Sequence, residues 1–113
     1  MPRYLYQASY TADGTKGLLK DGGSRRRIAV EEAARALGAK VEAFYFVLGD
    51  PDVIVIVDAP DNVSATAVSL VVNASGAVRL KTSVLLTPEE LDRASQKAPI
   101  YRAPGDKRGT GVS

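Results

Sequence analysis

Residues 41–58 read VEAFYFVLGDPDVIVIVD, and this stretch decides the predicted fold. Its aromatic and β-branched residues favour extended backbone, so we expect strands at 41–48 and 53–57. Gly49-Asp50-Pro51-Asp52 lies between them, where proline fixes φ and the aspartates can accept hydrogen bonds from the backbone. The two strands are therefore expected to form a β-hairpin.

The sequence before this hairpin predicts one strand and one main helix. Tyr4–Tyr10 alternates large and small side chains, as a half-buried strand does. Thr11–Gly14 is typical of a turn with a capping hydroxyl, followed by a short helix at most before the Gly22-Gly23 break. Ser24 can cap the next helix, and Gly38 is expected to end it. The apolar residues of this helix follow the spacing i, i+3, i+4 and i+7, which places them on one face: Val30, Ala33, Ala34 and Leu37.

The sequence after the hairpin predicts a helix, a strand and a short second helix. The apolar residues between Asp61 and Gly76 keep a helical period, which predicts the first helix. Asp61 is expected to cap this helix and Gly76 to end it. Residues 78–86 alternate apolar and polar side chains and are expected to form a strand. Thr87-Pro88-Glu89-Glu90 is a strong helix start, and we expect that helix to run to about Lys97.

The resulting order is strand, helix, strand, strand, helix, strand. This is the βαββαβ order of the ferredoxin-like α+β fold, in which four antiparallel strands carry two helices on one face. A length of 113 residues fits one hydrophobic core. We therefore expect one domain at residues 1–97, followed by a basic tail rich in proline and glycine at 98–113.

The predicted sheet has more apolar surface than its own helices can cover. Val53–Val57 is apolar at both strand parities, and Phe44–Leu48 adds a second apolar run. Two helices shelter only one face, and an exposed apolar face of this size normally marks an interface. The expected partner is a second copy of the chain, in a homodimer or a larger homo-oligomer.

The composition narrows the range of possible chemistry. The chain has no cysteine and no histidine, so it lacks a thiolate, a disulfide and the most common catalytic base and metal ligand. We expect neither a metal nor a cofactor, and the sequence leaves open whether the protein is an enzyme. It contains no segment typical of a signal peptide or a membrane span, which predicts a cytoplasmic protein.

The stretch Phe44–Asp52 resembles the signature of the GYD-domain family, bacterial proteins of mostly unassigned function. The resemblance covers about residues 3–95 and includes four further segments: Gly17–Ser24, Asp58–Ala65, Val72–Val78 and Leu86–Glu90. It implies a ferredoxin-like unit that assembles as a dimeric α/β barrel, with no established reaction. The chain differs from the family at the name-giving motif, since Pro51 stands where tyrosine is typical.

A candidate ligand site lies on the predicted sheet face away from the helices. Polar residues of matching parity on the first and last strands, which are neighbours in this fold, can converge there with two aromatic residues from further across the sheet. Such a cleft suits a small anionic or aromatic ligand. The alternative is that the two basic residues only protect an edge strand from misassembly. The residues are Gln7, Ser9, Phe44, Phe46, Arg79 and Lys81.

Two charged motifs each have a functional and a structural interpretation. Asp50 and Asp52 could bind a divalent cation or act as acid and base, or they could simply accept backbone N–H bonds in a turn. Of the two, Asp52 is the better ligand-binding candidate. Arg25-Arg26-Arg27 could contact phosphates, or it could form a solvated face in which Arg27 pairs with Glu31. The absence of interleaved aromatic residues argues against nucleic-acid binding.

These observations favour a homo-oligomeric protein that binds a small molecule between its sheet and its partner. A first alternative is a cofactor-independent enzyme, such as a small monooxygenase or isomerase of the dimeric α/β barrel type, that uses a tyrosine or Asp52. A second alternative is an assembly protein without a ligand.

Overall fold

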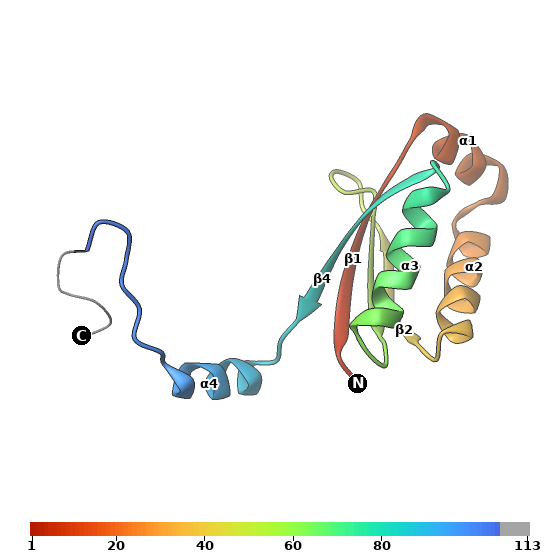
Figure 1. Ribbon diagram of the computed structural model, residues 1–113. Helices are drawn as coiled ribbons and strands as arrows, with labels where there is room; N and C mark the ends of the chain where they lie inside the picture. The colour runs from red at the N-terminus through yellow and green to blue at the C-terminus, as the bar shows by residue number, and fades with distance from the viewer. Residues whose placement is uncertain (107–113) are drawn as a thin grey trace.

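The computed structural model describes residues 1–106 and contains four strands and four helices there (Figure 1). The sheet order β2-β3-β1-β4, antiparallel throughout, confirms the predicted α+β, ferredoxin-like fold. The strands are β1 (Arg3–Tyr10), β2 (Lys40–Phe46), β3 (Val53–Asp58) and β4 (Val78–Leu85). The helices are α1 (Ala12–Asp21), α2 (Gly23–Ala36), α3 (Asn62–Ala74) and α4 (Pro88–Lys97).

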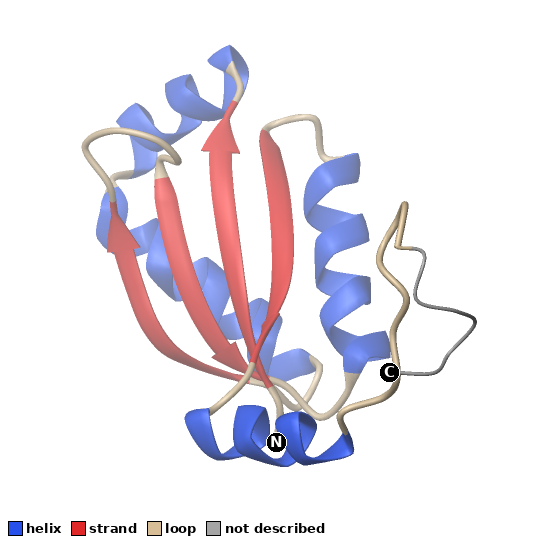
Figure 2. Cartoon of the chain, turned by 90° about the vertical axis from the view of Figure 1, so that its left-hand side faces the viewer, coloured by secondary structure: helices blue, strands red, loops and turns tan. Residues whose placement is uncertain are grey.

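The first three helices lie on one face of the sheet, and the view of the other face shows the strands in front of α1 and α2, with α3 beside β4 (Figure 2). The core forms between these two layers, because every second residue of the two central strands points toward the helices. Its buried members are Tyr4, Tyr6, Ala8, Val53, Val55, Val57, Ala59, Ala65 and Val78. None of the helices within residues 1–106 is long and apolar enough to cross a membrane, and the cytoplasmic location stays a prediction.

Strand β2 contains a β-bulge that changes which of its side chains face the helices. Val41 pairs with Val57, but the next paired residue is Ala43, so Glu42 is inserted without a partner of its own. One extra residue shifts the side-chain alternation of everything that follows. Phe44 therefore pairs with the buried Val55 and points to the helix side.

The bulge corrects one prediction. We expected Phe44 and Phe46 on the face away from the helices, and the structure places both on the helix face. Their rings meet edge to face with centroids 5.4 Å apart. Phe46 also lies so close to Gly23 of α2 that a Cβ there would come within 2.8 Å of the ring. These rings therefore support the packing of α2 against β2.

Three of the four predicted helix starts are confirmed. The Thr11 hydroxyl accepts from the Gly14 N–H at 3.2 Å, although α1 is a ten-residue helix rather than a turn with a short helix at most. The Asp61 carboxylate accepts from the Ser64 N–H at 2.8 Å, which lowers the pKa of Asp61. The prediction for Ser24 is wrong, because the residue that precedes α2 is Gly22, two positions earlier, and it provides no side-chain cap.

Helix α4 stands apart from the sheet and the other helices (Figure 1). The Thr87 hydroxyl accepts from the Glu90 N–H at 3.1 Å, which confirms the predicted helix start. The Glu90 carboxylate also accepts from the Thr87 N–H at 2.9 Å. The described residues extend over 61 × 29 × 24 Å, because this helix and the residues after it project from the body. We call residues 86–101 the arm. Residues 107–113 of the predicted tail lie outside the described residues.

Gly14 holds α1 directly against the start of β4, and this contact gives a testable prediction. A Cβ at this position would lie 2.0 Å from the carbonyl oxygen of Ala77, a backbone atom that cannot move aside by rotation. We expect Gly14→Ala to destabilise the protein by about 1–3 kcal/mol, measured by urea denaturation, although alanine is the better helix former.

Gly17 provides the matched control in the same helix, since a Cβ there would meet nothing within 4 Å. Gly17→Ala is expected to raise stability by up to about 1 kcal/mol. Equal changes in stability for the two substitutions would show that the close approach of α1 to Ala77 does not exclude a larger side chain at position 14.

Candidate functional site

The sheet face opposite the helices, which we call the open face, carries apolar side chains that no element of the described chain covers. Leu5 of β1 pairs with Ile56 of β3, which in turn pairs with Ala43 of β2. Ile54 and Leu85 extend the same surface, and all of these side chains are only half-buried. Tyr45 is 65% exposed on the outer strand. The structure thus confirms the predicted apolar surplus on this face.

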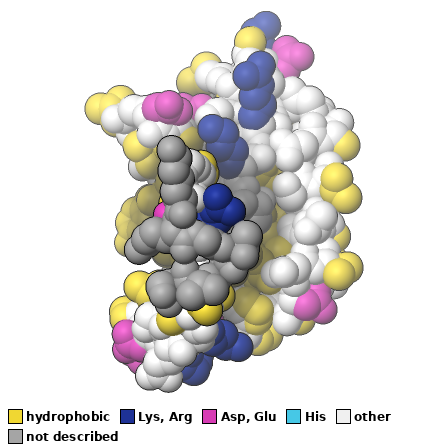
Figure 3. Space-filling model, turned by 60° about the vertical axis from the view of Figure 1, so that its left-hand side comes forward, with side chains coloured by type: hydrophobic (Ala, Val, Ile, Leu, Met, Phe, Trp, Pro, Cys, Tyr) yellow, Lys and Arg dark blue, Asp and Glu magenta, His cyan; other side chains and the backbone are white. Residues whose placement is uncertain are grey.

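Four of the predicted ligand-binding residues come together on the open face. Gln7 lies opposite Lys81, and Ser9 lies opposite Arg79, in the β1–β4 register. Neither basic side chain has an ion-pair partner within residues 1–106. Figure 3 shows a line of Lys and Arg side chains over the upper part of this side of the molecule. The two phenylalanines of the predicted cleft are absent from this group because the bulge turns them to the helix face.

The opposite end of the open face carries an ion-pair cluster. Arg3 lies 3.0 Å from a Glu42 carboxylate oxygen and 3.3 Å from one of Asp58. The pKa of Glu42 is raised, mainly because its carboxyl group hydrogen-bonds that of Asp58. Between this cluster and the base of the arm lies a concavity of about 970 Å³, to which Ile56 and Arg93 contribute. The open face and the arm therefore border one hollow.

Asp52 has a structural role at the end of the hairpin turn. Its carboxylate accepts from the Tyr10 N–H at 2.8 Å, and its own N–H donates to the Ala8 carbonyl at 2.9 Å. Its carbonyl accepts from the Val47 N–H at 2.7 Å. These bonds tie the turn to β1. No group of three or more acidic residues within residues 1–106 is arranged to hold a metal ion.

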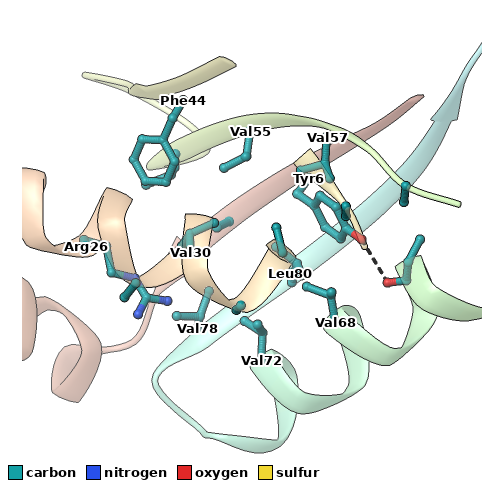
Figure 4. Close-up of a pocket in the computed structure, with 18 of the residues that line it drawn as sticks. Tyr6, Arg26, Val30, Phe44, Val55, Val57, Val68, Val72, Val78 and Leu80 are labelled. Carbon is teal, nitrogen blue, oxygen red and sulfur yellow. Dashed lines mark hydrogen bonds between the residues drawn. The ribbon is translucent and has the colours of Figure 1, made fainter. Parts of the chain in front are cut away.

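An apolar cavity of about 190 Å³ lies between the sheet, α2 and α3 (Figure 4). Its floor includes Val55 and Val57 of β3. Val30 of α2 lines one wall, and Val68 and Val72 of α3 line the other. Alanines on both helices leave this space open, because their side chains are too short to meet across it: Ala29, Ala33 and Ala34 on α2 and Ala65 on α3.

Two polar groups lie at opposite ends of the cavity in Figure 4. At one end, the Tyr6 hydroxyl donates to the Ala65 carbonyl at 2.9 Å. Burial raises the pKa of Tyr6, and the neighbouring Tyr4 adds to this shift, so the phenol stays protonated. At the other end lies Arg26 of α2. No carboxylate is among the described residues that line the cavity.

A comparison with protein-family models matches residues 4–95 to the GYD domain. The chain belongs to the GYD-domain family. The matched region of this GYD domain includes most of the sheet, all of α1–α3, the cavity and most of α4. No curated protein and no solved structure matches the chain significantly.

The cavity of the GYD domain is the feature that sequence reasoning missed. We expected two helices to cover this face of the sheet and identified no cavity beneath them. The available signal was the small size of the inward residues of α2, where three alanines line the cavity within six positions: Ala29, Ala33 and Ala34. A helix with such short inward side chains can pack closely against a sheet but cannot fill a space beside it.

Proposed function

We propose that this GYD-domain protein is a homodimer in which each copy binds one small molecule, through its apolar part, in the cavity between α2, α3 and the sheet. The cavity is the observation that supports binding. Apolar cavities of about 150 Å³ are large enough for benzene, and the cavity here is about 190 Å³. A ligand with a single ring and a short substituent has the appropriate size.

The open face supports self-association. Its half-buried Leu5, Ile54 and Ile56 are continuous across the two central strands, and a second copy laid across them would remove this apolar surface from water. In such a dimer Gln7, Ser9, Arg79 and Lys81 would lie at the margin of the interface, where polar residues are common.

The arm supports the same proposal. Helix α4 has ten residues, and isolated helices shorter than about 12–15 residues are marginal in water. Its Leu91 is 62% exposed, and Ile100 and Tyr101 beyond it are also exposed. A second copy that occupies the hollow between the arm and the open face would cover these side chains and stabilise the helix.

Binding is favoured over catalysis by the chemistry of the cavity. An isomerase or a monooxygenase needs a group that can accept a proton near its substrate. None of the described lining residues carries a carboxylate, and the chain has no histidine. The phenol of Tyr6 is held in a hydrogen bond with its pKa raised, and Arg26 cannot accept a proton. The hydroxyls of Tyr10 and Ser64 have no general base among the described lining residues. Asp52 is tied to β1 rather than to the cavity.

Titration with ethylbenzene, followed by NMR of the valine methyl groups, tests the proposed site. We expect saturable shifts at Val55, Val68 and Val72 in the unmodified protein. Val68→Phe fills the cavity and should weaken ethylbenzene binding at least tenfold. Val71→Phe on the same helix is the matched control, because Val71 is 72% exposed, and it should leave binding unchanged. Absence of these shifts in the unmodified protein would rule out the proposed binding site.

A further inference from the structure

The charged group of the cavity comes from a run of three arginines at the start of α2. Arg25 is exposed, and Arg27 lies 3.9 Å from Glu31 across one helical turn. Arg26 is half-buried and lines the cavity, and Figure 4 shows its guanidinium on the side of Val72 and Val78. The run is therefore not a uniform solvated face, because its middle member turns inward.

The charge of Arg26 has no partner in the described part of the chain. Within residues 1–106 its guanidinium has neither a hydrogen bond nor an ion pair. Partial burial of a charge without a partner costs free energy. A cation in the first turns of a helix is also opposed by the helix dipole, and the first turn of α2 contains no acidic residue to offset it. An anion beside the guanidinium would remove both penalties.

We propose that the ligand of the cavity is a small aromatic carboxylic acid whose carboxylate pairs with Arg26 and whose ring fills the apolar space. This inference rests on the proposed binding function. The planar guanidinium presents two parallel N–H groups that match a carboxylate. Arg26 is the only Lys or Arg among the described residues that line the cavity, which suits a monoanion. The valine-rich walls provide the contacts for the ring.

Two isosteric probes test the inference, namely 4-ethylbenzoate and 4-ethylbenzamide. They share size and shape and differ in charge at pH 7. We expect the unmodified protein to bind the benzoate about tenfold more tightly, measured by calorimetric titration, because a charge-assisted pair is stronger than a neutral one. Arg26→Gln should abolish this preference and still bind the benzamide. Arg25→Gln, with the same loss of charge one residue away, should retain the preference.

The outcomes distinguish a failure of the role of Arg26 from a failure of the proposed binding function. Equal affinity of the unmodified protein for both probes would contradict the role of Arg26 and leave apolar binding in place. A preference for the benzoate that persists in Arg26→Gln would also overturn the inference, since another group would then recognise the carboxylate. If neither probe nor ethylbenzene binds, the proposed binding function fails and the inference fails with it.

Discussion

Val55→Asp is expected to abolish the folded state. Val55 is 6% exposed on a central strand, between Tyr6 and Phe44, with its side chain in the core. An uncompensated charge at such a site costs about 3–5 kcal/mol or more, while small domains have a total stability of about 5–15 kcal/mol. Circular dichroism at 25 °C should show loss of the native signal, or a urea midpoint shifted strongly downward.

The neighbouring position provides the control for this result. Ile56 belongs to the same strand and has a similar apolar side chain, but it points to the open face. As a monomer, the Ile56→Asp protein should keep its fold, because water can reach the new carboxylate. A Val55→Asp protein as stable as Ile56→Asp would contradict the assignment of the two faces.

The second large effect is on assembly, where Ile56→Asp is expected to give a folded monomer. Ile56 lies between Leu5 and Ala43 in the middle of the open face. In a dimer that covers this face, the aspartate would lose its water in the middle of an apolar surface. A cost of about 3 kcal/mol corresponds to a dissociation constant raised at least about 100-fold. Sedimentation velocity at micromolar concentration should show the change.

Val63→Asp is the matched control for assembly. Val63 is 79% exposed on α3, on the helix side of the sheet, so the new charge stays in water and far from the proposed interface. This variant should sediment as the unmodified protein does. If Ile56→Asp keeps the sedimentation coefficient of a dimer, the interface does not lie on the open face.

The sequence predicted the fold well because the deciding signals are local. The alternation in Tyr4–Tyr10 and the valine–isoleucine run at 53–57 are properties of single strands, and both strands form as expected. The caps at Asp61 and Thr87 depend on residues only three positions away. The pairing of Gln7 with Lys81 then follows from the strand order of the fold.

The features that the sequence did not reveal depend on tertiary packing. The bulge at Glu42 reverses the orientation of Phe44 and Phe46, and no local pattern marks the position of an extra residue. The cavity depends on how α2 and α3 pack on the sheet, which brings their short alanine side chains to the same space. Arg26 was identified only as part of a basic run, because its inward direction depends on where α2 packs.

The central claim is that a second copy covers the open face, and the solution mass of the full-length chain tests it most directly. Sedimentation equilibrium at micromolar concentration should give twice the chain mass of 12.0 kDa. A stable, folded species of 12.0 kDa across this concentration range would contradict the account.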